Sequence, residues 1–320
     1  MNKPYAIGID LGGINTAFGI VNRKAEILFQ NSIPTGGYAK AEDYVNHLGD
    51  AIAAMVEENK LNGMMNGIGM GVPNGNMNDG TVENAANIPW TKGVKVELAK
   101  MMTEKTGLPC KLTNDANAAA MGEMAYGVAK GMKDFIVITL GTGVGSGIVS
   151  NGQLVVGHDG FAGELGHVRV VRENGRACGC GRTGCLETYA SATGVARTAR
   201  EFLLLQAEKP SVLREIQLRP ITSLDVYEAA CKGDELALEI FNFTGKILGE
   251  AFCDFIAFSS PEAIILFGGL ANSGRFLLEP LNRAIDENIC FVYKGKTKIL
   301  ISELNNAKAA ILGASALGWE

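Results

Sequence analysis

Three cysteines and one histidine lie close together near the middle of the sequence. His167, Cys178, Cys180 and Cys185 follow the pattern H-x10-C-x-C-x4-C, with glycines between the cysteines. Zinc prefers thiolate and imidazole ligands in a tetrahedron, and a closed Cys₃His set is typical of structural sites. Cys178 and Cys180 are too close in sequence for an easy mutual disulfide. The spacing therefore predicts one structural Zn²⁺ ion held by this loop.

Two glutamates bracket the cysteine-rich loop. Glu164 lies three residues before His167, and Glu187 lies two residues after the last cysteine. Recognition of a polyol needs carboxylates, amides and imidazoles that pair with several hydroxyls at once. If zinc takes one ring nitrogen of His167, the other remains free for a hydroxyl, and the metal orients the sugar contacts. We therefore expect Glu164, His167 and Glu187 to bind a sugar, the alternative being two solvated surface carboxylates.

Three glycine turns each follow an apolar stretch of strand length: Asp10–Gly13, Gly141–Gly147 and Gly268-Gly269. Glycine lets backbone N–H groups approach a polyanion without a Cβ clash. Asp10, at a strand end, is suited to hold Mg²⁺ against phosphates. For any one of these turns taken alone, an ordinary tight turn is a simpler interpretation than a phosphate-binding site. The Rossmann and P-loop glycine signatures are absent at these turns.

Asp115 occupies a point where a short strand is expected to give way to an alanine-rich helix. Aspartate most often serves as a simple N-cap at such a position. The functional alternative is a carboxylate aimed into a cleft, where it accepts the proton of an attacking hydroxyl. The residues alone do not decide between these two roles.

The elements that must position these groups follow from hydrophobic periodicity and turn residues. Strands are expected at residues 5–10, 15–21, 26–33, 67–72, 110–113 and 263–267. Helices are expected at 41–61, 91–106, from 115 onward, 192–208, 223–232, 235–258 and 307–317. The stretch 136–149 repeats the pattern of 7–21, which indicates two related α/β lobes, each opening with a hairpin around a glycine turn. The last helix is expected to fold back on the first lobe.

Composition limits the class of protein. The chain has 320 residues, 47% hydrophobic content and a net charge of −5. This length and hydrophobic content allow about two packed domains, and the acidic charge argues against bulk nucleic-acid binding. The N-terminal apolar stretch is too short for a signal peptide, and no transmembrane span is expected. We therefore expect a cytoplasmic protein with no membrane and no nucleic-acid partner.

Taken together, the motifs resemble a known group of proteins. Asp10-x-Gly12-Gly13, Leu140-Gly141-Thr142-Gly143 and Leu266-Phe267-Gly268-Gly269 are similar to the phosphate-1, phosphate-2 and adenosine motifs of the actin/hexokinase/Hsp70 ATPase superfamily. Within it, Cys178-Gly-Cys-Gly-Arg-Thr-Gly-Cys185-Leu-Glu187 resembles the signature of the ROK family. The resemblance covers essentially the whole chain. It implies a two-lobed α/β, actin-like (RNase H-like) ATPase fold with the active site in the inter-lobe cleft.

The resemblance also implies roles for residues. Asp115 would be the catalytic base, and Asn114 and Asn87 would bind sugar along with Asp115, Glu164, His167 and Glu187. The residues implied for ATP and Mg²⁺ are Asp10, Gly12, Gly13, Thr16, Gly141, Thr142, Gly143, Gly268 and Gly269. One departure stands out, because the family usually has Gly-Gly-Thr-Lys where this chain has Gly12-Gly13-Ile14-Asn15. Asn15 or Thr16 is expected to replace the hydroxyl missing at position 14.

The function implied is transfer of the ATP γ-phosphate to the 6-hydroxyl of a hexose such as glucose. N-acetylhexosamines, fructose and allose are alternative acceptors, and a non-catalytic sugar-sensing ROK regulator is the alternative class. The expected lobes are residues 1–114 with 304–320, and residues 115–303, which carry the zinc loop. ROK relatives also lead us to expect a homodimer or homotetramer.

Overall fold

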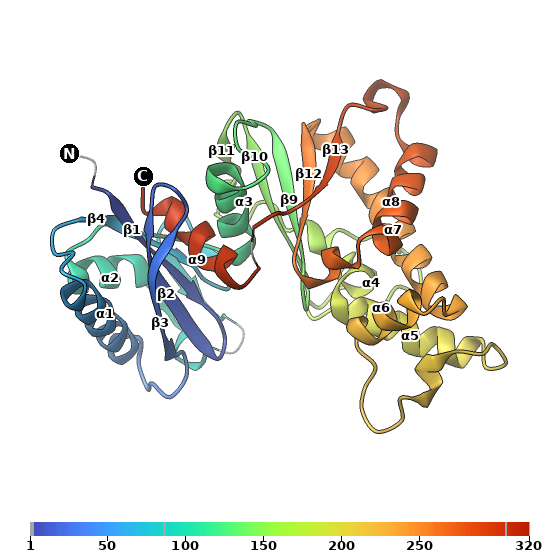
Figure 1. The fold of residues 1–320 in the computed structure, drawn as a ribbon, viewed down its shortest axis with the longest axis horizontal. Coiled ribbons are helices and arrows are strands. Elements are labelled where there is room, and N and C mark those ends of the chain that lie inside the picture. Colours follow the sequence, from blue (N-terminus) through green and yellow to red (C-terminus); the bar gives the residue numbers. More distant parts are fainter. Residues whose placement is uncertain (1–2, 86–87, 305, 320) are drawn as a thin grey trace. The chain divides into compact units, whose positions relative to one another are not determined.

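A computed structural model describes residues 3–85, 88–304 and 306–319, in a mixed α/β fold (Figure 1). The first sheet has the strand order β3-β2-β1-β4-β8. Its strands are β1 (Tyr5–Leu11), β2 (Asn15–Asn22), β3 (Ile27–Pro34), β4 (Met65–Gly71) and β8 (Cys110–Thr113). Strands β1, β2 and β3 are antiparallel neighbours, whereas β1, β4 and β8 run parallel.

The second sheet repeats this plan, with the order β11-β10-β9-β12-β13. Its strands are β9 (Phe135–Leu140), β10 (Val144–Ser150), β11 (Gln153–Leu154), β12 (Ala263–Phe267) and β13 (Lys298–Ile301). Strands β9, β12 and β13 are parallel, as are β1, β4 and β8 in the first sheet. The shared order confirms the repeat expected from the sequence. A small third sheet contains β5 (Gly75–Asn76), β6 (Thr81–Glu83) and β7 (Lys95–Val96).

Helices fill the connections between strands. Those of the first part are α1 (Ala41–Glu58), α2 (Leu98–Thr106) and α3 (Asp115–Tyr126). Later in the chain come α4 (Glu187–Ala190), α5 (Ala192–Leu205), α6 (Ser223–Cys231), α7 (Glu235–Ser259), α8 (Arg275–Asn288) and α9 (Asn306–Leu317). Helices α7 and α8 pack extensively on one another.

The chain divides into two compact units. The first contains residues 1–133, 147–163 and 302–320, and the second contains residues 134–146 and 164–301. Helix α3 therefore packs with the N-terminal sheet. The first unit also receives α9, which confirms that the last helix folds back on the N-terminal part.

Successive side chains along β1 and β4 point to opposite faces of the first sheet, and the two faces differ in composition. Ile7 and Ile9 belong to a core cluster that also contains side chains from α1 and α2. The opposite face is built from glycine, because a Cβ at Gly8 would lie 2.0 Å from the carbonyl oxygen of Ile311. A Cβ at Gly69 would lie 1.9 Å from the carbonyl oxygen of Ala314. Helix α9, red in Figure 1, thus lies directly against the backbone of the blue N-terminal strands.

One expected helix is wrong in its first half. Instead of a helix over 91–106, the chain forms a 3₁₀ turn (Pro89–Thr91), then β7, and begins α2 only at Leu98. Gly93 lies between them with φ +69°, a left-handed conformation that interrupts a right-handed helix.

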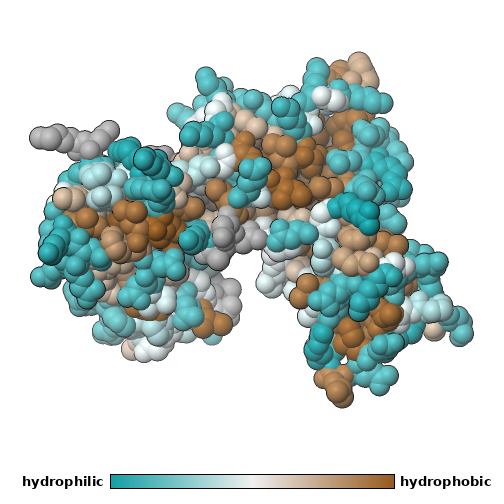
Figure 2. Space-filling view, viewed as in Figure 1, coloured by the Kyte–Doolittle hydropathy of each residue, from teal (hydrophilic) through white to brown (hydrophobic). Residues whose placement is uncertain are grey.

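The surface carries some apolar side chains. Leu204, Leu205 and Leu218 are fully or largely exposed, on α5 and in the loop that follows it. Figure 2 shows apolar areas among the polar surface of the part that carries α5 to α8. Among the described residues, none of the helices combines the length and apolar character needed to span a bilayer.

Candidate functional site

The carboxyl ends of β1, β4 and β8 bring two aspartates to one edge of the first sheet. Asp10 pairs in register with Gly71, and Gly71 pairs with Thr113, two residues before Asp115. A Cβ on Gly71 would lie 3.8 Å from Oδ1 of Asp115. Asp10 and Asp115 therefore lie on either side of Gly71, at the same edge of the sheet.

The helix cap at this edge is Asn114, not Asp115. The side-chain Oδ1 of Asn114 accepts the backbone N–H of Asn117 at 2.7 Å, and Asp115 is the first residue of α3. Because the neighbouring asparagine caps the helix, the Asp115 carboxylate is free for another role. The capping role that the sequence left open for Asp115 is therefore excluded. Within the described part of the chain, the two N–H groups of the Asn114 side-chain amide have no partner, so they could donate to a hydroxyl.

The electrostatics of this edge favour a proton acceptor. Burial, together with the smaller effect of the negative charge of Asp10, raises the pKa of the Asp115 carboxyl to about 7. The side chain nonetheless keeps one open side toward solvent. Burial also raises the pKa of Asp10. A carboxylate with a pKa near neutrality is well matched to general-base catalysis.

The hairpin between β1 and β2 forms the first glycine turn. The N–H of Gly12 donates to the carbonyl of Asn15 at 3.1 Å, and the side chains of Ile14 and Asn15 point into solvent. Thr16 is fully buried, and its hydroxyl is paired with Thr35 and Tyr44. The expectation that Thr16 supplies a phosphate-facing hydroxyl is therefore wrong, and Asn15 is the polar side chain left at this turn.

The other two glycine turns meet at the ends of neighbouring strands in the second unit. Strands β9 and β12 are parallel, with Thr139 opposite Phe267. Gly268 has φ +103°, and a Cβ there would lie 2.8 Å from the carbonyl oxygen of Leu140. The turn Gly141–Gly143 is closed by a 3.1 Å hydrogen bond from the N–H of Gly141 to the carbonyl of Gly143. Two glycine-containing turns thus lie side by side.

A pocket of about 280 Å³ adjoins Gly269 in the same unit. It is lined by Ser223, Leu224 and Tyr227 of α6 and by the residues that follow Gly269. An aromatic ring, aliphatic groups and a few polar groups are typical of a site for a flat organic ring. The helix expected at 223–232 is present as α6 and begins with a capping box at Thr222, but the sequence analysis gave it no role in a site.

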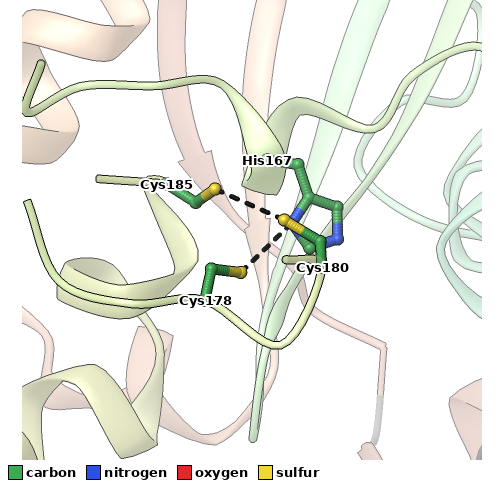
Figure 3. Close-up of side chains that lie close together, drawn as sticks. All are labelled: His167, Cys178, Cys180 and Cys185. Atoms are coloured by element: carbon green, nitrogen blue, oxygen red, sulfur yellow. Dashed lines mark hydrogen bonds between the residues drawn. The ribbon is translucent and has the colours of Figure 1, made fainter. Parts of the chain in front are cut away.

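The Cys₃His cluster has the geometry of a zinc site (Figure 3). The four ligand atoms lie within 4.8 Å of one another. Sγ of Cys178 lies 3.6 Å from Nδ1 of His167, and Sγ of Cys180 lies 3.7 Å from Sγ of Cys185. Tetrahedral zinc, with bonds of about 2.3 Å to sulfur and about 2.0–2.1 Å to nitrogen, requires S···N and S···S edges of about 3.6 and 3.8 Å. The donor set and its spacing therefore fit Zn²⁺.

His167 presents its two ring nitrogens to different surroundings. Nδ1 faces the sulfur cluster, which leaves Nε2 for another partner. His167 and Glu164 both line a pocket of about 540 Å³ in the second unit. Gly166, between them, presses against β10, because a Cβ there would lie 1.9 Å from the carbonyl oxygen of Val144. The zinc loop and β10 thus hold the Glu164–His167 segment in place.

Glu187 links the zinc cluster to the second glycine turn. Its Oε1 lies 3.6 Å from Sγ of Cys178, and its Oε2 accepts the N–H of Val144 at 3.1 Å. A Cβ at Gly143 would lie 2.2 Å from Oε2, so a side chain there would displace the Glu187 carboxylate. Sequence reasoning named Gly143 and Glu187 but missed this contact between them.

The sequence-derived candidates thus form one group in each unit. Asp10, Gly12, Gly13, Asn114 and Asp115 lie in the first unit, and the zinc ligands, Glu164, Glu187, Gly141, Thr142, Gly143, Gly268 and Gly269 lie in the second. Asn87 falls outside the described residues.

Comparison with known proteins identifies the group to which these features belong. The profile of the ROK family matches residues 6–320. The chain belongs to the ROK family. A solved structure of a ROK family glucokinase from Streptomyces griseus, in complex with glucose and AMPPNP, is similar with a TM-score of 0.77 and 33% identity over 98% of both chains. The fold is thus the actin-like ATPase fold of ROK sugar kinases.

Curated relatives include both enzymes and a regulator. A glucokinase of Halalkalibacterium halodurans is 35% identical over 100% of this chain and 95% of its own length. The DNA-binding transcriptional dual regulator NagC of Escherichia coli is 27% identical over 98% of this chain and 75% of its own length. Similarity to the glucokinase is the greater and supports a ROK sugar kinase.

Proposed function

We propose that this ROK protein is an ATP-dependent hexose kinase with glucose as its acceptor. The observation that carries the proposal is the state of Asp115, a helix-start carboxylate freed from capping, whose pKa is raised to about 7. Similarity to glucokinases along the whole chain supports the reaction class. Proposed partners are ATP and the hexose, and the cytoplasm is the proposed location.

The proposed chemistry is an in-line phosphoryl transfer. The 6-hydroxyl oxygen of the hexose attacks the γ-phosphorus of ATP, its proton passes to a carboxylate oxygen of Asp115, and the bond to the bridging oxygen of ADP breaks. The products are hexose 6-phosphate and ADP. The glycine turns at Gly12-Gly13, Gly141–Gly143 and Gly268-Gly269 are proposed to bind the nucleotide with their backbone groups. Glu164, His167, Glu187, Asn114 and Asn87 are proposed to bind the sugar hydroxyls.

Two metal ions are part of the proposal. Zn²⁺ would be held by His167 and the three cysteines, where it would orient His167 Nε2 and Glu187. Mg²⁺ would be held near Asp10, a largely buried carboxylate to which no hydrogen bond or ion pair is assigned in the part of the chain that the structure describes. When bound, Mg²⁺ would neutralise phosphate charge.

The test is ADP release measured over a panel of hexoses and N-acetylhexosamines. Glucose is expected to give the highest kcat/KM, and Asp115→Asn is expected to abolish most of the turnover. Preference for N-acetylglucosamine, N-acetylmannosamine, fructose or allose would correct the acceptor but keep the kinase. Sugar binding without ADP release from any acceptor would instead favour a sugar-sensing regulator, the class to which the relative NagC belongs. The proposed homodimer or homotetramer is checked by light scattering.

A further inference from the structure

Three buried hydroxyl groups form a hydrogen-bonded chain behind the first glycine turn. Thr16, Thr35 and Tyr44 are each 0% exposed. The hydroxyl oxygen of Thr16 lies 2.9 Å from that of Thr35 and 2.9 Å from that of Tyr44. They come from β2, from the residue that follows β3 and from α1, so the bonds join three separate elements. Because a buried hydroxyl without a partner costs free energy, the central hydroxyl of Thr16 holds those of Thr35 and Tyr44 in place.

Thr35 is the point at which this chain meets the glycine turn. Its backbone N–H donates to the carbonyl oxygen of Ile14 at 2.8 Å. Ile14 lies in the turn that is proposed to bind the ATP phosphates. A shift of this turn therefore moves Thr35 or breaks a short backbone hydrogen bond.

Thr35 also holds a tryptophan from a different loop. The indole N–H of Trp90 donates to the carbonyl oxygen of Thr35 at 3.2 Å. The ring of Trp90 stacks on the ring of Tyr44 with centroids 4.7 Å apart and planes 23° apart. Trp90 is thus bound to two members of the hydroxyl chain at once.

The loop that carries Trp90 is the one with which the proposed function associates sugar binding. Thr91 closes this loop on itself, because its side-chain oxygen donates to the carbonyl of Ile88 and accepts the N–H of Ala85. The N–H of Asn84 also donates to the carbonyl of Thr91 at 3.0 Å. Trp90 and Thr91 therefore hold the described parts of this loop, Asn84–Ala85 and Ile88–Thr91, in place.

We infer that Thr16, Thr35 and Tyr44 are positioning residues that couple nucleotide binding at the first glycine turn to sugar binding by the loop that carries Trp90. The inference rests on the proposed function for the identity of the two ligands. None of the three touches substrate, since all are buried. Coupling of this kind is reciprocal, so nucleotide tightens sugar binding by the same factor by which sugar tightens nucleotide binding.

The variant that tests this is Tyr44→Phe, which removes one hydroxyl and keeps the ring that stacks on Trp90. Glucose affinity is measured by calorimetry with and without AMPPNP, and the ratio of the two values is the readout. For the wild type we expect AMPPNP to tighten glucose binding by about 5-fold or more, the lower end of common coupling factors. In Tyr44→Phe the ratio is expected to approach one.

Tyr38→Phe is the matched control. The Tyr38 ring packs edge-on against Tyr44 with centroids 5.5 Å apart, but its hydroxyl is paired with His47 outside the hydroxyl chain. This variant should keep the wild-type ratio. Thr16→Ser, which retains the central hydroxyl, should also keep it, whereas Thr16→Val should lose it.

A second readout follows Trp90 directly. The chain has two tryptophans, so a Trp319→Phe background leaves Trp90 as the single indole emitter. AMPPNP without sugar is expected to change its emission, and Tyr44→Phe is expected to reduce that change. A structural role alone would lower the melting temperature without altering either readout.

Each outcome bears on the inference. A wild-type ratio of one, or a Tyr44→Phe variant that is less stable but keeps the wild-type ratio, overturns it. If wild-type protein releases ADP with glucose while the ratio is one, only the coupling fails and the kinase stands. If wild-type protein binds glucose and AMPPNP but releases no ADP, the proposed function fails, and the ratio still decides the coupling.

Discussion

Replacing Asp115 with asparagine separates catalysis from structure at the edge of the first sheet. The change keeps the shape of the side chain and removes its charge. Helix α3 should be unaffected, because its cap is Asn114. Loss of a general base commonly costs about 10²–10⁴-fold in rate. We therefore expect kcat to fall by that factor while glucose affinity changes little.

The same variant should become more stable at neutral pH. The pKa of Asp115 is raised from 3.8 to about 7, so the folded protein holds this proton more tightly than the unfolded chain. Wild-type stability therefore falls as pH rises from about 4 to about 7, and the loss stays constant above that range. Asparagine cannot ionise and avoids this loss.

The size of the gain follows from the pKa. A rise from 3.8 to about 7 corresponds to about 4 kcal/mol for a fully buried carboxylate. Because one side of Asp115 is open to solvent, screening reduces this to about 1–2 kcal/mol. In urea unfolding at pH 4, variant and wild type should have the same free energy of unfolding. At pH 8 the free energy of unfolding of the variant should be higher by this amount.

The assay needs a matched control and a pH series. Asp43→Asn makes the same change in the first turn of α1, at an exposed position, and should leave kcat and stability near wild type. Wild-type turnover should rise about tenfold per pH unit up to about 7 and then level off. An Asp115→Asn variant that turns over glucose within a few-fold of wild type would refute the assignment, and Asp10 or Glu164 would become the next candidate base.

Three further predictions concern the zinc loop and two glycine turns. Cys180→Ser should lose about one zinc per chain, measured by elemental analysis, together with sugar phosphorylation; zinc-free purified wild-type protein would disprove the site. Gly143→Ala should lower kcat by about tenfold or more, because the new Cβ would meet Glu187 at 2.2 Å, and unchanged kinetics would contradict that contact. Ile14→Thr should lower the KM for ATP with stability within about 0.5 kcal/mol of wild type, since Ile14 is 80% exposed; an unchanged KM would mean that Asn15 already supplies the contact.

Strand and turn chemistry made much of the architecture predictable. The apolar runs before the three glycine turns, and the likeness between residues 7–21 and 136–149, anticipated two sheets of the same order. The burial of Thr16 could also have been predicted, because side chains alternate along a strand. Thr16 lies on the same face of β2 as the buried Phe18 and Ile20. The incorrect assignment took sequence proximity to the turn as sufficient and ignored side-chain direction.

Other features depend on contacts that sequence patterns do not contain. Helix α8 was not anticipated. Pro280 lies in its interior, where proline disfavours a helix, yet α8 packs against α7 at Gly245 and Gly249. The choice of Asn114 over Asp115 as the cap is a shift of one residue in the helix start, below the precision of sequence patterns. The contact between Glu187 and Gly143 joins residues far apart in the chain, so the glycine carried no local signal of it.

The packing of α9 on Gly8 and Gly69 has a consequence for how the chain is made. The first unit contains both β1 and α9, so β1 can complete its packing only after α9 has left the ribosome. At ordinary rates of synthesis this delay is roughly 15–60 s. During that time the glycine face of β1 and β4 has no side chains to shield its backbone. The first unit therefore cannot complete its fold until α9 has been synthesised, and a chaperone that binds exposed sheet backbone has the whole delay in which to act on it.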